Sequence, residues 1–494
     1  MRAASSATPS SREGATVTLT SPAPGAALRP ARTRRPWFGA LMLRLHFFAG
    51  ILVGPFILIA AVSGALYAVA PTLEQIVYAH ELRAPATAER LTLAEQIRIA
   101  EEHVDSGPGA DGATLAAVRP APGPGDTSRI MFAQEGLGSS ESRAVFVDPG
   151  TGEIRGDLTV YGTSGSLPLR TWISNLHRTL HLGDLGRNYS ELAASWLGIV
   201  ALAGLVLWIV RIRKARVRRD LVRPNRAHTG YRRLFGWHTS VGIWVLLGAL
   251  FLSATGITWS QYAGANVSNL RAALDWTGPA LRTTLGEEAD APVDEHAAHR
   301  GAVSAPTGAA NPATFDAVLA IAQRANVNTG QVEIAPPAEA GMAWTVREIK
   351  TGFPTEGDRL AIDGSSMQIT DRIDFADLPL AAKLADWGVS LHMGVLFGPL
   401  NQIVLLLIAT GITTMVVLGY AMWWKRRPTH APSRLVGSTP RRGALRDAPW
   451  WGLGAVVAAS ALIGLWLPLI GWTLVGFVVI DTAIGVVKSR TSVS

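Results

Sequence analysis

Five long stretches without a charged residue constrain this chain more than any other feature. They are Leu45–Leu73, Leu192–Val210, Leu234–Leu270, Trp387–Trp424 and Ala448–Ile480. A bilayer core about 30 Å thick needs roughly 20 apolar residues in a helix, so the first four stretches each predict one membrane span. The fifth is interrupted by Pro468 and Gly471 and predicts a hairpin of two spans. The expected fold is therefore a polytopic α-helical membrane protein with six spans.

Basic residues predict the orientation of these spans. Residues 1–44, 211–233 and 425–447 carry 7, 10 and 7 Lys and Arg, each against one acidic residue. The longer segments 74–191 and 260–386 together carry 19 Lys and Arg against 33 acidic residues. Short basic loops stay in the cytoplasm, so we expect the long segments outside and both termini inside. The net charge of +8 is then a topology signal, and nucleic-acid binding is not needed to explain it.

The chain contains no cysteine. This excludes disulfides, thiolate metal sites, iron–sulfur clusters and covalent haem attachment through Cys-x-x-Cys-His. Residues 1–40 are basic and rich in Ala, Ser and Pro, which predicts a disordered tail. The apolar run after this tail is longer than the core of a signal peptide, so we interpret it as an uncleaved anchor.

The chain also reads as an internal repeat. The first and third spans match without a gap, and both place a histidine and two glycines at the same offsets: His46, Gly50 and Gly64, then His238, Gly242 and Gly256. The segments that begin at His177 and His392 match over 34 residues. Two parallel copies imply a pseudo-twofold axis along the membrane normal. We therefore expect His46 to face His238 near the cytoplasmic side, and His177 to face His392 near the outer side.

The glycine spacing suggests what these histidine pairs could hold. Gly50 lies four residues after His46, and Gly64 lies 18 residues after it, five turns and about 27 Å along one helix face. A wide, flat group bound at both depths would need this clearance. Haem fits, because neutral imidazole ligates its iron, and without cysteine it would be noncovalent b-type haem. We thus predict two haems, with these four histidines as ligands and Gly50, Gly64, Gly242 and Gly256 beside them.

Other interpretations of these residues remain open. A histidine at a span end is commonly an interfacial residue, and glycines in spans commonly mediate helix packing. Two histidine pairs could also bind zinc or copper. His181 has no partner in the repeat; one turn after His177, it could bond a haem propionate, substitute as a ligand or lie at the interface. Asp481, inside the last apolar stretch, could handle protons or cap a helix.

Each long outside segment has an amphipathic helix pattern, "LTLAEQIRIAEEHV" or "ATFDAVLAIAQRANV", and ends in a strand-and-turn pattern, "AVFVDPGTGEIRGD" or "RLAIDGSSMQITD". These patterns predict small α+β domains.

The four span motifs carry a resemblance to a known family. They are "LHFFAGILVGPFILIAAVSGALY", "LHRTLHLGDLGRNYSELAASWLGIVALAGLVLW", "GWHTSVGIW" and "LHMGVLFGPLNQIVLLLIATGITTMVVLGYAMWWKRR". Over residues 35–430 the chain resembles the PepSY-associated transmembrane family, bacterial membrane proteins related to iron uptake that include ferric-siderophore reductases. The resemblance implies PepSY-like domains outside the membrane. It also implies a two-haem path through His46, His177, His238 and His392.

These inferences divide the chain as follows: tail 1–40, span 41–70, extracytoplasmic PepSY-like domain 71–190, span 191–211, basic cytoplasmic loop 212–233, span 234–259, second PepSY-like domain 260–390, span 391–424, basic loop 425–448, hairpin 449–487 and cytoplasmic tail 488–494.

The expected function is electron transfer across a bacterial cytoplasmic membrane through two haems to a ferric siderophore. No catalytic side chain is predicted. No Gly-x-Gly-x-x-Gly fingerprint follows a strand, so the electron donor would be a quinol or a cytoplasmic reductase. The competing hypotheses are a PepSY-domain regulatory protein without redox activity and a copper-binding or transport protein.

Overall fold

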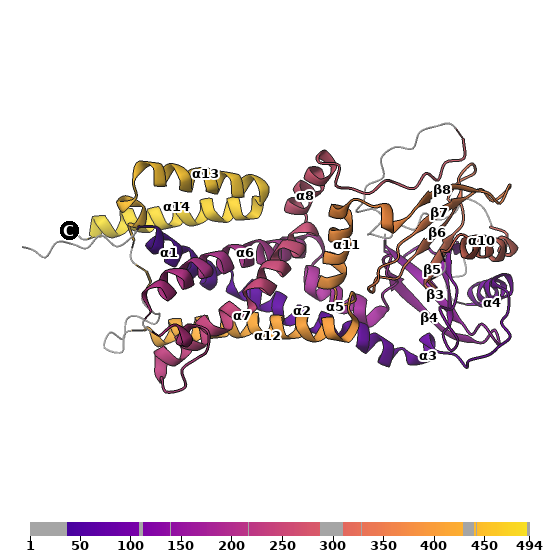
Figure 1. The fold of residues 1–494 in the computed structure, drawn as a ribbon, viewed down its shortest axis with the longest axis horizontal. Helices are drawn as coiled ribbons and strands as arrows, with labels where there is room; N and C mark the ends of the chain where they lie inside the picture. Colours follow the sequence, from indigo (N-terminus) through magenta and orange to yellow (C-terminus); the bar gives the residue numbers. More distant parts are fainter. Residues whose placement is uncertain are drawn as a thin grey trace, which may run out of the picture.

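The computed structural model describes residues 37–107, 112–138, 140–215, 217–286, 310–327, 329–427, 439–440 and 442–491. Most of the predicted tail 1–40, much of the predicted loop 425–448 and the last residues of the predicted tail 488–494 lie outside these ranges. The molecule is elongated: long helices form one end, and an antiparallel sheet forms the other (Figure 1).

Within the described residues, four helices are long and apolar enough to cross a membrane: α2 (Gly54–Val77), α6 (Gly183–Lys214), α7 (Gly230–Thr258) and α12 (Gly398–Lys425). Helix α12 packs against α2 and α7, and α6 packs against α7 and α1 (Trp37–Leu52). The long helices run side by side (Figure 1). These four helices overlap the first four predicted spans.

The first predicted span is divided into two helices. The division lies at Val53, just before Pro55, which occupies the first turn of α2. Proline has no N–H and is tolerated in the first turn of a helix. The carbonyl of Ile51, four residues earlier, instead accepts a hydrogen bond from the hydroxyl of Tyr420 at 2.6 Å. His46 therefore lies on α1 and Gly64 on α2, so the predicted single face is interrupted.

The predicted hairpin consists of α13 (Trp450–Trp466) and α14 (Pro468–Thr491). Both are apolar but shorter than the four long helices in their described apolar parts. Asp481 forms ion pairs with Arg44 of α1 and with Arg442, each at 3.2 Å. The carboxylate of Asp481 thus connects the hairpin to α1 through ion pairs, and does not act as the expected helix cap.

The two outside segments build one sheet rather than two separate ones. Its eight strands have the order β4-β3-β2-β1-β5-β6-β7-β8, all neighbours antiparallel. The strands are β1 (Thr114–Arg119), β2 (Ser128–Ala133), β3 (Glu141–Val147), β4 (Ile154–Tyr161), β5 (Val332–Ala335), β6 (Trp344–Glu348), β7 (Arg359–Ile362) and β8 (Ile369–Ile373). Strand β1 pairs with β5 at Val118 and Ile334. This pairing removes two exposed strand edges, which the separate segments would each have to protect.

Helices α4 (Leu93–Ser106) and α10 (Pro312–Arg324) pack against each other and cover one face of this sheet (Figure 1). Their apolar sides meet the buried strand residues Val118, Ile130 and Ile334. The carboxylate of Asp316 in α10 accepts hydrogen bonds from the first two backbone N–H groups of α4, at 2.8 and 3.0 Å. An acidic group at a helix N-terminus stabilises the helix. Asp316 of the second outside segment therefore stabilises α4 of the first.

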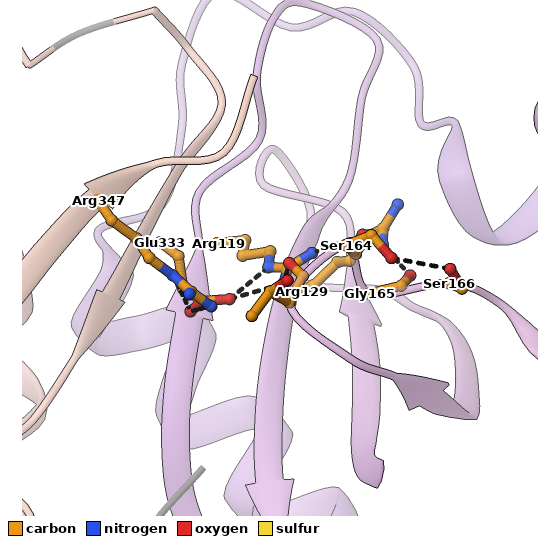
Figure 2. Close-up of polar contacts among 8 residues, drawn as sticks. Arg119, Arg129, Ser164, Gly165, Ser166, Glu333 and Arg347 are labelled. Carbon is orange, nitrogen blue, oxygen red and sulfur yellow. Dashed lines mark hydrogen bonds and ion pairs between the residues drawn. The ribbon is translucent and has the colours of Figure 1, made fainter. Parts of the chain in front are cut away.

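On the opposite face, buried charges join the two halves of the sheet (Figure 2). Glu333 on β5 accepts hydrogen bonds from Nε of Arg119 on β1 at 2.7 Å and from Nε of Arg347 on β6 at 2.8 Å. Burial alone would raise the pKa of Glu333, but the two guanidinium groups outweigh it and hold the pKa below its usual value. The carboxylate therefore stays ionised at neutral pH.

The same cluster fixes the loop that leads to helix α5 (Pro168–Thr179). Arg119 donates to the carbonyl oxygens of Thr163 and Ser164 at 2.8 and 3.2 Å, and Arg129 donates to that of Gly165 at 3.1 Å (Figure 2). The position of α5 thus depends on the junction of the sheet.

Between the sheet and the long helices lie α5, α8 (Tyr262–Ala273) and α11 (Leu380–His392) (Figure 1). The remaining short elements are α3 (Ala79–Leu82), η1 (Arg218–Leu221), η2 (Phe375–Asp377) and η3 (Ala444–Asp447).

Candidate functional site

The structure brings His46 of α1 and His238 of α7 together within the helical bundle. Their ring centroids lie 6.1 Å apart, and the rings are inclined at 79°. Nδ1 of His46 lies 2.9 Å from the carbonyl oxygen of Val200. A carbonyl can only accept, so Nδ1 carries the proton and Nε2 is free to bind a metal. Nδ1 of His238 is buried and makes no hydrogen bond of ordinary geometry among the described residues.

His177, near the end of α5, and His392, at the end of α11, line one cavity of about 190 Å³. Residues of α2, α6, α7 and α12 also line this cavity. His177 and His392 are thus carried by the shorter helices α5 and α11, and both side chains face the cavity between the long helices.

Two hydroxyl groups hold the outer histidines in matching ways. Ser63 Oγ lies 3.0 Å from Nδ1 of His177, and Thr255 Oγ1 lies 2.6 Å from Nδ1 of His392. Each hydroxyl also donates its proton to a helix carbonyl, Ser63 to that of Ile59 and Thr255 to that of Phe251, both at 2.7 Å. A hydroxyl has one proton to donate, so each accepts from the imidazole, whose Nε2 is left as a ligand.

Ser63 and Thr255 were not identified from the sequence as site residues. A signal for them exists, since each directly precedes a glycine of the repeated set, Gly64 or Gly256. Metal-binding histidines usually donate their second ring N–H to a fixed acceptor. Three of the four histidines here meet this condition, through Val200, Ser63 and Thr255.

Two of the four predicted glycines lie against the outer histidines. A Cβ at Gly64 would lie 3.0 Å from Cε1 of His177, and one at Gly256 would lie 3.9 Å from Cε1 of His392. Both glycines line the cavity. The structure does not bring Gly50 or Gly242 to a histidine: a Cβ at Gly50 would meet no described atom within 4 Å, and one at Gly242 would meet Met415.

The glycine that approaches the inner pair is Gly204 on α6, whose Cβ would lie 3.1 Å from Cε1 of His46. It is one turn after Val200, whose carbonyl accepts the hydrogen bond from the same ring. Gly204 lies within the segment that begins at His177 and matches the one that begins at His392, but only the packing of α1 on α6 shows that it faces His46.

His181 does not join His177, which corrects the expectation of a shared helix face. Helix α5 ends at Thr179, and both Leu180 and His181 have left-handed backbone conformations with φ of 51° and 56°. The i to i+4 geometry of a helix therefore does not extend to His181. Its ring instead packs against Trp172, with centroids 5.0 Å apart.

The remaining wall of the outer cavity combines small residues with two cations. Ala60, Ala193 and Ala194 leave room between the helices, and Arg178 and Arg187 bring positive charge to the cavity. Two imidazole nitrogens, clearance and cationic partners would suit a flat iron macrocycle with carboxylate side groups. Among the described residues no group of three or more His, Asp or Glu could hold a bare metal ion.

A comparison with known families identifies a matching family model. The model of the PepSY-associated TM region matches residues 43–426, which include all four histidines. A comparison with curated protein sequences finds no match.

Proposed function

Because the chain belongs to the PepSY-associated transmembrane family, we propose that it transfers electrons across a bacterial cytoplasmic membrane through two b-type haems. His46 and His238 would hold the inner haem, and His177 and His392 the outer one. Haem, when bound, supplies one-electron chemistry that the side chains themselves lack. The protein sets its position and its potential.

The observation that carries this proposal is the shared protonation pattern of the histidines. In three of the histidines, Nδ1 donates a hydrogen bond, to Val200, Ser63 or Thr255. Nε2 of each of these rings is therefore left free as a ligand. A histidine that only packs at an interface has no need of this fixed tautomer. Gly64 and Gly256 keep the space beside the outer rings open.

The proposal includes the internal repeat and the six spans. Ser63 and Thr255 follow His46 and His238 by the same number of residues, and each contacts the outer histidine of its own half. Equivalent contacts in the two halves support a pseudo-twofold axis through the bundle. Helices α13 and α14 would supply the last two spans, with both termini in the cytoplasm.

The direction of transfer is from the cytoplasm outwards. A quinol or a separate cytoplasmic reductase would supply the electrons, and a ferric siderophore outside would accept one electron per Fe(III). Reduction to Fe(II) weakens binding by hard oxygen ligands, so iron would be released. Two haems suit this task, because one cannot connect both faces of a core about 30 Å thick.

Absorption spectra of the detergent-purified protein, oxidised and dithionite-reduced, with a pyridine haemochrome count, test this proposal. We expect two b-type haems per chain, with one lost in His46→Ala or His238→Ala and the other in His177→Ala or His392→Ala. His80→Ala is the matched control, since the His80 side chain is exposed and its Nδ1 lies 2.9 Å from the carbonyl oxygen of Arg155, away from both histidine pairs. It should retain both haems.

A colourless protein from haem-replete cells would overturn the electron-transfer proposal. Stoichiometric copper binding that depends on the same four histidines would then favour a copper-binding or transport protein. Neither haem nor copper would favour a regulatory role for the outside sheet.

A further inference from the structure

Helix α5 has two different faces. Ser174, His177 and Arg178 line the outer histidine cavity. Thr171, Trp172 and Asn175 line a second pocket of about 230 Å³ on the other side. A single helix therefore separates the two spaces.

The second pocket lies between α5 and the edge of the sheet. Its lining comprises Glu141, Thr159, Tyr161, Pro168, Thr171, Trp172, Asn175 and His181. The indole of Trp172 is 53% exposed, so the pocket is open to solutes outside the bundle. Among the described residues that line this pocket there is no lysine or arginine, and Glu141 supplies a carboxylate. This charge pattern disfavours anions and suits a ligand without net negative charge.

His181 is held over Trp172 by an uncommon backbone conformation. Left-handed conformations at successive non-glycine residues such as Leu180 and His181 cost energy and occur where the surrounding structure requires them. Here they place the imidazole 5.0 Å from the indole. Together with Tyr161 these rings give the pocket aromatic walls with hydrogen-bonding edges.

One contact joins the two spaces directly. Arg178 lines the histidine cavity, and its Nη1 donates to the hydroxyl of Tyr161 at 3.3 Å. Tyr161 lines the second pocket. A ligand there would lie one helix from the outer histidine pair, linked to it by this hydrogen bond.

We propose that this pocket binds the electron acceptor as an iron(III) complex without net negative charge, such as a neutral tris-hydroxamate. This inference rests on the proposed function. One electron from the reduced outer haem would convert bound Fe(III) to Fe(II), and the cytoplasmic donor would replace that electron.

Binding is tested without redox chemistry by titrating the purified full-length protein with gallium(III) tris(acetohydroxamate), a redox-inert neutral complex. Trp172→Ala should weaken binding about tenfold or more, because aromatic anchors dominate small binding sites. Trp276→Ala is the matched control, since Trp276 is similarly exposed at 46% and is not among the pocket residues. Gallium(III) tris-catecholate, which carries three negative charges, should bind more weakly than the neutral hydroxamate complex. Glu141→Gln removes a negative charge from the pocket and should reduce this difference in affinity.

Equal affinity for the gallium hydroxamate in Trp172→Ala and in the Trp276→Ala control, or no binding to either the parent protein or the control, would overturn the docking site. The gallium titration does not depend on haem. A colourless protein that binds the gallium complex through Trp172 would refute the electron-transfer proposal and would still support the binding site. In a haem-loaded protein, Trp172→Ala should also slow haem reoxidation by ferric tris(acetohydroxamate) about tenfold, whereas Trp276→Ala should not.

Discussion

At the scale of single residues, the site depends on hydroxyl groups and on the absence of side chains. The histidines and their pairing could be predicted from the repeat alone, because matched offsets place them at matched depths. Their hydrogen-bond acceptors could not, since Ser63 and Thr255 are common helix residues whose role appears only when α5 and α11 fold over the bundle. The prediction that His181 shares a helix face with His177 was wrong, because α5 ends at Thr179 and the spacing of the two histidines does not show where a helix ends.

Gly64 provides a steric test of the outer site. Gly64→Val would place Cβ 3.0 Å from Cε1 of His177, tighter than ordinary contact, so the ring must move. We expect loss of the outer haem with retention of the inner one, measured by haemochrome count and redox titration.

Gly454→Val is the matched control, because Gly454 lies on α13, apart from both histidine pairs, and a Cβ there meets no described atom within 4 Å. It should bind both haems. Equal loss of haem in the two variants would show that valine disturbs the helices and not the histidine.

At the scale of elements, the sequence predicted the helices and strands well but not how they combine. Amphipathic and alternating patterns identify α4, α10 and the strands from local periodicity. The pairing of β1 with β5 joins residues separated by more than 200 positions, and no local pattern specifies it. The ion pairs of Asp481 were missed for the same reason, since Arg44 lies at the other end of the chain.

Glu333 makes the sheet junction sensitive to acid. Its pKa is lower in the folded protein than in the unfolded chain, so its contribution to stability is complete above about pH 4.3, the usual Glu value. That contribution is lost as the pH falls through the lower folded value. Glu333→Gln leaves two buried guanidinium groups without their carboxylate, and removing one partner of a buried ion pair costs about 3–5 kcal/mol.

Thermal unfolding of the detergent-purified protein at neutral and acidic pH measures this effect. Glu333→Gln should lower Tm at pH 7, and the difference from the parent should shrink below pH 4. The control Glu153→Gln removes a carboxylate that is 58% exposed and should change Tm little. A difference that persists at low pH would contradict the assignment.

Asp481 is expected to position the inner histidine through α1. Asp481→Asn weakens the ion pairs with Arg44 and Arg442, and Arg44 lies two residues from His46. Inner haem occupancy should therefore fall while the outer haem is retained. A matched control is Thr482→Val, which removes a hydroxyl that donates to the carbonyl of Val478 within the same helix. Full occupancy of both haems in Asp481→Asn would show that the ion pairs of Asp481 stabilise the fold but do not position His46.

At the scale of the whole molecule, the membrane orientation is directly testable. The chain has no cysteine, so single cysteines can be labelled without background. In intact cells, a membrane-impermeant maleimide should label Ser106→Cys, at the end of α4. It should label Asn225→Cys, between α6 and α7, only after the cells are opened. The reverse labelling pattern would overturn the proposed topology and the proposed direction of electron transfer.

The shared sheet also has a consequence for how the protein is made. Strand β1 leaves the ribosome long before β5, and two further membrane helices, α6 and α7, are synthesised between them. In the proposed topology, with the sheet outside the membrane, the first four strands expose the edge of β1 until β5 has been exported, and an open edge is prone to wrong pairings. Export of the second half therefore completes the first, and a chain interrupted after α7 should be recognised by quality-control proteases as unfinished.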